Sequence, residues 1–278
     1  MKNNNLKPAG TPAWFPVALF AIVLVVMFWR SFLPDYVFFN NDGPLGVQNA
    51  AWVKMPAGVT GMWVDLNYLG NSGGAYTPSL TAMFHSLFSP LFYAKFFQMF
   101  DLFIVALGTW MLFRALKLSP LASTLGALAA MLNSTYFSTA CWGVGTQEIA
   151  VGMNSFALAL IVGCSSSTPI VVRWVRLMLA GMCVGVNVME ASDIGALYSL
   201  LVALFVFVHA LADGEGAPIK RIFRGVGRVA VVAAFAAFIS LQAVLSLVGL
   251  VGTTAQGSAP AAQDHDSKAR QWDWATQW

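Results

Sequence analysis

Asp42 is the first residue in the chain whose type and setting could do chemistry. It lies in "VFFNNDGPLGVQNA", next to two asparagines and just before a Gly-Pro turn. A carboxylate held in such a turn could act as a general base towards an acceptor hydroxyl, or as a ligand for a hard divalent cation. The same letters are compatible with an ordinary turn or a helix cap. Asp42 is therefore a catalytic candidate with an open structural alternative.

Asp65 is the second catalytic candidate. It lies in "GMWVDLNYLG", where Trp63 and Tyr68 offer the stacking and hydrogen-bonding groups that suit a sugar. We predict Trp63 and Tyr68 as substrate contacts. The alternative is an aromatic belt at the membrane interface that contains one solvated acid.

Glu190 and Asp193 form a third feature, in "VMEASDIGAL". Residues three apart share a face if the segment is helical, and two acids near lipid without a basic partner are costly. They could bind a hydroxyl-bearing substrate or, together with Asp42, a divalent cation; the alternative is a hydrated turn. A divalent cation is thus a candidate cofactor, but the sequence does not identify the metal.

Two further acids lie within apolar segments. Asp101, in "FFQMFDLFIVALG", is predicted at membrane depth, where a proton or substrate role competes with a structural pairing to Lys95 or to another helix. Glu148 begins a predicted helix, where its charge suits the helix dipole.

The composition identifies the environment of these acids. Of 278 residues, 58% are hydrophobic and 10% are charged, compared with about 25% charged in soluble proteins. The chain is therefore predicted to be a membrane protein. Its formal charge of +3 is too small to suggest a nucleic-acid partner. The three cysteines and three histidines are dispersed, so they indicate neither a metal centre nor a disulfide framework.

Apolar runs of nearly bilayer length recur along the chain, and helices satisfy their own backbone groups in lipid. We predict an all-α, polytopic transmembrane bundle with about seven spans. The spans are expected at 14–33, 92–113, 120–140, 148–164, 174–190, 194–211 and 229–251.

The basic residues predict the orientation. Basic clusters at 114–117, 173–176 and 220–228 alternate with loops that lack them, and Lys2 and Lys7 precede the first span. The positive-inside rule then places the N-terminus in the cytoplasm. The chain divides into a cytoplasmic N-terminus at 1–13, a first transmembrane helix at 14–33, an outside loop with interfacial helices at 34–91, six further transmembrane helices within 92–251 and an outside segment at 252–278.

Several segments together resemble the GT-C superfamily of membrane glycosyltransferases, and more narrowly bacterial YfhO-like membrane proteins. The segments are "NNDGPLGVQ", "WVDLNYLGNSGGAYTPSL", "MEASDIGALYSL" and "QWDWATQW". The resemblance implies the bacterial inner membrane and transfer of a sugar from a polyprenyl-phosphate donor at the outer face. It also implies that Asp42 is the base or metal ligand, and that Asp65, Glu190 and Asp193 line the same cleft.

The chain departs from the family pattern in length. Family members usually have ten or more spans, so this chain resembles their N-terminal portion, and it would be inactive alone if further helices supply part of the donor site. The alternative function is a non-enzymatic structural or accessory subunit of a membrane complex, with other membrane subunits as its partners.

Overall fold

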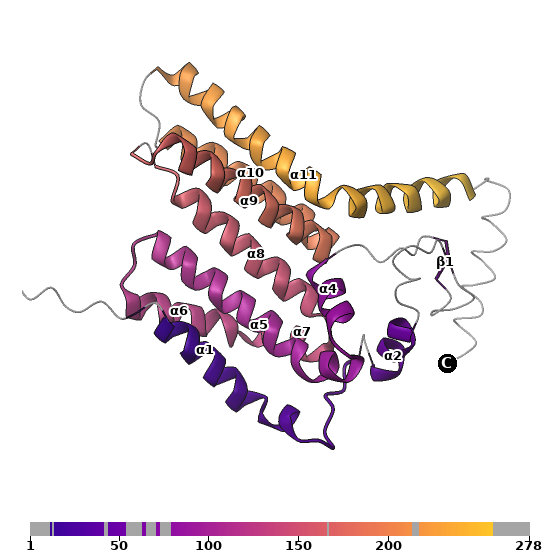
Figure 1. The fold of residues 1–278 in the computed structure, drawn as a ribbon. Coiled ribbons are helices and arrows are strands. Elements are labelled where there is room, and N and C mark those ends of the chain that lie inside the picture. The colour runs from indigo at the N-terminus through magenta and orange to yellow at the C-terminus, as the bar shows by residue number, and fades with distance from the viewer. Residues whose placement is uncertain are drawn as a thin grey trace, which may run out of the picture.

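The structure is a computed structural model that describes residues 12, 14–41, 44–53, 63–64, 71–72, 79–165, 167–212 and 217–257. Helices dominate these residues (Figure 1). In chain order the elements are α1 (Trp14–Met27), η1 (Trp29–Phe32), α2 (Leu45–Val53), β1 (Trp63–Val64), β2 (Asn71–Ser72), α4 (Leu80–Leu87), α5 (Pro90–Ala115), α6 (Pro120–Met131), α7 (Ser134–Trp142), α8 (Gly145–Val162), α9 (Ile170–Glu190), α10 (Ser192–Ala212) and α11 (Pro218–Gly257).

Five of the described helices are long and apolar enough to cross a membrane: α5, α8, α9, α10 and α11. They correspond to five of the seven predicted spans and indicate a lipid bilayer environment. The predicted fold class, an all-α helical bundle, is confirmed.

The other two predicted spans are shorter in the structure. Helix α1 has 14 residues, roughly 21 Å at about 1.5 Å per residue, compared with a hydrocarbon core of about 30 Å. The predicted span at 120–140 is two helices, α6 and α7, because Asn133 starts a new helix by accepting a hydrogen bond from the Thr135 N–H at 2.9 Å. A total of seven spans stays a prediction.

Helices α5 and α8 pack against each other at the centre of the bundle. Their close approach depends on Gly108 and Gly152, since a Cβ at Gly108 would collide with the carbonyl oxygen of Gly152. Apolar clusters lie on both sides of this pair. One joins α1, α5, α6 and α7 around Phe20 and Leu102, and the other joins α8, α9, α10 and α11 around Ile161 and Val206.

Helix α11 packs along α9 through two glycines of α9. A Cβ at Gly181 would lie 2.6 Å from the Val232 carbonyl oxygen, and one at Gly185 would lie 2.6 Å from Ile239 Cβ. Small residues spaced four apart let two helix backbones approach closely. Helix α11 begins at Pro218 rather than at residue 229, and Figure 1 shows it bending and running beyond the rest of the bundle.

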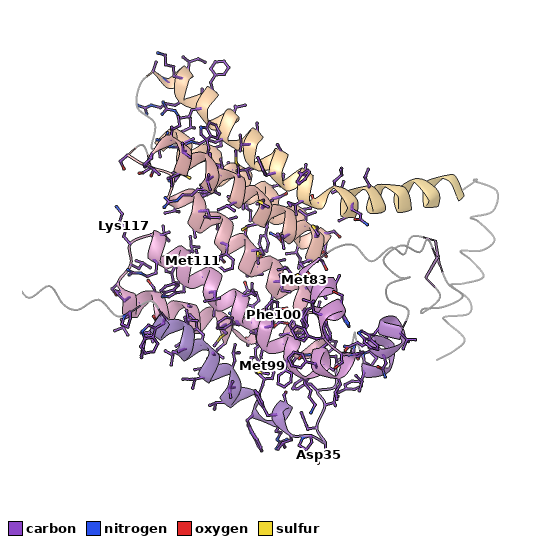
Figure 2. All side chains as sticks on the ribbon, in the orientation of Figure 1. Asp35, Met83, Met99, Phe100, Met111 and Lys117 are labelled. Atoms are coloured by element: carbon purple, nitrogen blue, oxygen red, sulfur yellow. The ribbon has the colours of Figure 1, made fainter. Side chains whose placement is uncertain are left out.

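The bundle has two ends of different chemistry. The C-terminal ends of α5, α8 and α10 lie together, and we call this the basic end because it holds Arg114, Lys117, Arg173, Arg176 and Lys220 (Figure 1). The opposite end, where α5 and α8 begin, holds Asp101, Glu148 and Glu190, and we call it the acidic end. In Figure 2, Lys117 and Asp35 lie at opposite ends of the molecule.

The segment between α1 and α5 contains local structure that the sequence analysis expected in part. Helix α2 follows Pro44, whose carbonyl oxygen accepts from the Gln48 N–H at 3.2 Å. Strands β1 and β2 pair antiparallel, and α4 begins after Ser79, whose hydroxyl accepts from the Ala82 N–H at 3.0 Å. The predicted outside loop therefore includes two short helices in its described residues.

Candidate functional site

Three buried carboxylates from three helices lie at the acidic end. The exposed fraction is 0% for Asp101 on α5, 0% for Glu148 on α8 and 9% for Glu190 on α9. Burying a carboxylate among apolar side chains is expensive unless hydrogen bonds or a cation compensate. The partners of each carboxylate therefore indicate its role.

Glu190 is held by the N-terminus of α4. One carboxylate oxygen accepts from the backbone N–H groups of Leu80 and Thr81, the latter at 3.1 Å, and the other accepts from the Thr81 hydroxyl at 2.6 Å. The first N–H groups of a helix have no partner within the helix, so Glu190 supplies one across the bundle. Its carboxylate anchors α4 to the end of α9.

Asp193 is separated from Glu190 by a break in the helix. Helix α9 ends at Glu190, Ala191 is extended, and α10 starts at Ser192. Asp193 is exposed in the first turn of α10, where its charge suits the helix dipole. The two residues thus do not lie on one continuous helix, and one is buried while the other faces outward. Their predicted substrate-binding role stays a prediction.

Asp101 lies against the first turn of α8. A Cβ at Gly145 would collide with the Asp101 carboxylate, and no side chain caps α8 at Val144. The carboxylate therefore faces the positive end of a helix dipole. Within the described part of the chain, neither of its oxygens has a hydrogen-bond partner on another side chain.

Glu148 lies one turn further along α8. Its Oε1 accepts a hydrogen bond from the Thr139 hydroxyl on α7, whereas its Oε2 has no hydrogen-bond partner among the residues that the structure describes. Glu148 and Asp101 interact electrostatically. Two buried carboxylates with spare oxygens can share a proton or accept a small cation.

The predicted pairing of Lys95 with Asp101 is not formed. The Lys95 ammonium donates to the carbonyl oxygens of Leu33, at 2.6 Å, and Pro34, at 3.5 Å. One turn further along α5, the Gln98 amide donates to Asn40 Oδ1 at 2.9 Å. The first turns of α5 therefore hold the chain that follows α1. The carboxylate of Asp101 instead lies against the first turn of α8.

His85 on α4 packs against Tyr93 on α5. Their rings are stacked, with centroids 3.7 Å apart, and the Tyr93 hydroxyl interacts electrostatically with Asp101 and Glu190. Burial lowers the pKa of His85, so its imidazole is neutral at pH 7.

The predicted catalytic pair lies outside the described residues. This holds for Asp42, Asp65 and the predicted substrate contact Tyr68. Trp63 belongs to strand β1, but its side chain is not described. Among the described residues there is no group of three or more His, Cys, Asp or Glu side chains that could hold a metal ion. The candidate ligands Glu190 and Asp193 thus have no third ligand in that part of the chain.

The sequence analysis missed the residues that hold the carboxylates. Thr81 and Glu190 are 109 residues apart, so no local pattern links them. Thr139 and Glu148 are nine apart but belong to different helices. Threonine is common in apolar segments, and only the packed structure singles out these two.

Comparison of the chain with known protein families, with curated proteins and with solved structures finds no match.

Proposed function

We propose that the chain acts in sugar transfer as a GT-C, YfhO-like membrane protein that uses a polyprenyl-phosphate sugar as donor. The proposal places it in the bacterial inner membrane with its N-terminus in the cytoplasm and its acidic end outside. The gathering of arginines and lysines at the basic end supports this orientation through the positive-inside rule.

The observation that carries the proposal is the anchoring of the segment between α1 and α5. Asn40 is buried and accepts from Gln98, and α4 is held by Glu190. This segment contains the sequence that resembles the family, including Asp42. A segment fixed onto a bundle at both of its ends can hold reacting groups in a defined geometry, which is where much of an enzyme's rate enhancement arises.

In this proposal Asp42 is the base or metal ligand that activates the acceptor hydroxyl. Asp65 assists it, Trp63 and Tyr68 contact the sugar, and Asp193 lines the cleft. Glu190 acts as a positioning residue, since its oxygens already hold α4.

The test is sugar transfer by the full-length protein in proteoliposomes that contain a tritium-labelled polyprenyl-phosphate hexose. We expect Asp42→Asn to reduce transfer by roughly 100-fold or more, because it removes the general base. Asp35→Asn is the matched control, since Asp35 is an exposed acid at the start of the same segment. Both variants must insert as well as the wild type. Full transfer activity of Asp42→Asn would contradict the proposal. The proposal would also be contradicted if the wild type transferred sugar from no hexose or pentose donor.

One observation favours the second candidate, a non-enzymatic accessory subunit. The structure describes two of the predicted site acids. Glu190 holds α4 through its carboxylate oxygens, and Asp193 is exposed. An accessory subunit would use its acids only for packing. It would then be purified from its native membrane in a fixed stoichiometry with another subunit, and Asp42→Asn would leave the activity of that complex unchanged.

A further inference from the structure

A pocket at the end of α1 combines polar and apolar walls. It has a volume of about 410 Å³ and lies where η1, the chain that follows it and α7 meet. Its lining residues are Met27, Phe28, Trp29, Arg30, Ser31, Tyr36, Phe38, Phe137 and Cys141.

The polar wall consists of hydrogen-bond donors. Arg30 supplies a guanidinium 5.7 Å above the Trp29 ring, while Tyr36 supplies a hydroxyl group. No carboxylate is among the lining residues. A ligand group that satisfies this wall carries negative charge and several acceptor oxygens.

The apolar wall is aromatic. Phe28 packs against Phe38 and Phe137, with ring centroids 5.9 Å and 5.4 Å away. Trp29 and Phe32, at the end of the first apolar run, are exposed. Aromatic side chains exposed at the end of a membrane helix are typical of the headgroup level of a bilayer.

We propose that this pocket binds the phosphate headgroup of an anionic membrane phospholipid. Arg30 and Tyr36 donate to the phosphate oxygens, and the first part of the acyl chains lies on Phe28 and the neighbouring aromatic rings. A metal cation would find no carboxylate there, and free phosphate would leave the aromatic wall unused. The assignment does not depend on the proposed sugar transfer.

The experiment is a lipid titration of the delipidated full-length protein in detergent, followed by native mass spectrometry. The probes are dioleoylphosphatidylglycerol, dioleoylphosphatidylcholine, decaprenyl phosphate and inorganic phosphate. We expect phosphatidylglycerol to bind about fivefold more tightly than phosphatidylcholine, in keeping with one basic residue near an anionic surface. Inorganic phosphate should not compete at equal concentration.

Two variants connect binding to the pocket. Arg30→Gln should weaken phosphatidylglycerol binding by about fivefold and abolish the preference over phosphatidylcholine. Tyr36→Phe should weaken binding by removing one donor to the phosphate, while leaving the thermal stability of the lipid-free protein near that of the wild type. A fold defect would instead lower the lipid-free stability, so the two effects are distinguishable.

Arg114→Gln is the matched control. Arg114 lines an equally large groove at the basic end, between α1, α5 and α6, whose lining is otherwise almost entirely apolar. If Arg30→Gln and Arg114→Gln weakened phosphatidylglycerol binding equally, the attraction would be an unspecific surface effect. This result would overturn the proposal. Tighter binding of decaprenyl phosphate than of phosphatidylglycerol would overturn the phospholipid assignment, as would full competition by inorganic phosphate.

Discussion

At the basic end, arginines lie near helix termini and donate to backbone carbonyl oxygens, whereas at the acidic end carboxylates are buried between helices. Arg114 donates to the Leu118 carbonyl oxygen at 2.8 Å, and Arg173 donates to that of Thr168 at 2.9 Å. Asp101 and Glu148 are wholly enclosed and retain oxygens without partners in the described residues.

Membrane topology explains the basic residues at the basic end. It does not explain the buried carboxylates at the acidic end. Arg114 lies in the last turn of α5, where a cation is favourable, and the positive-inside rule accounts for the gathering of basic residues at this end. A buried carboxylate without a cationic partner lowers the stability of the fold. Stability therefore does not account for the carboxylates at the acidic end, which are candidates for a functional role.

Glu190→Ala should lower the free energy of unfolding by about 3 kcal/mol, because three donors of α4 lose a charged acceptor. Glu190→Gln should cost about 1 kcal/mol, since it keeps an acceptor oxygen. Unfolding in dodecyl maltoside titrated with SDS measures both values. Asp193→Asn is the control and should leave stability near that of the wild type. A wild-type stability for Glu190→Ala would show that α4 is not held by this carboxylate.

Gly145→Ala should lower the free energy of unfolding by about 2 kcal/mol, because the added methyl group collides with the Asp101 carboxylate. In an Asp101→Ala background the same change should cost less than about 0.5 kcal/mol. Gly227→Ala at the basic end is the matched control. Nothing lies within 4 Å of a Cβ there, so alanine should raise stability by up to about 1 kcal/mol. Equal costs in both backgrounds would mean that Asp101 does not approach Gly145.

The smallest effect concerns the pH dependence of stability. Burial lowers the pKa of His85 below its ordinary value of 6.5, so the unfolded chain binds a proton more readily than the folded protein. Stability should therefore fall as the pH drops below about 6.5, until the folded-state pKa is passed. Comparing thermal unfolding of the wild type and His85→Gln from pH 8 to pH 5 isolates this contribution. If the unfolding temperatures of the two proteins changed identically with pH, a contribution from His85 would be excluded.

The sequence predicted the long helices well, because each is a long apolar run. The span predicted at 194–211 is α10, Ser192–Ala212, and the one predicted at 92–113 is α5, Pro90–Ala115. Hydropathy is insensitive to interruptions, however. It passed over Asn133, where a side-chain oxygen competes with the helix for the Thr135 N–H.

The contacts of the acids could not be predicted in the same way. Glu190 was expected near lipid at the end of a helix, but its partner α4 is brought to it only by the fold. A pairing of Lys95 with Asp101 was one of the alternatives, yet the flexible Lys95 side chain reaches the carbonyl oxygen of Leu33 instead. Arg30 was assigned to the first apolar run, and its neighbours become apparent only once the chain turns after α1.

The two glycines of α9 form the surface onto which α11 docks. Gly181 and Gly185 form a shallow groove that receives the backbone of α11 at Val232 and Ala236. During synthesis α9 precedes α11, so the groove is complete before its occupant leaves the ribosome. Association within the bilayer depends on close backbone packing, with little help from the exclusion of water. Helix α11 thus joins α9 by shape, and a methyl group added to either glycine would obstruct this docking.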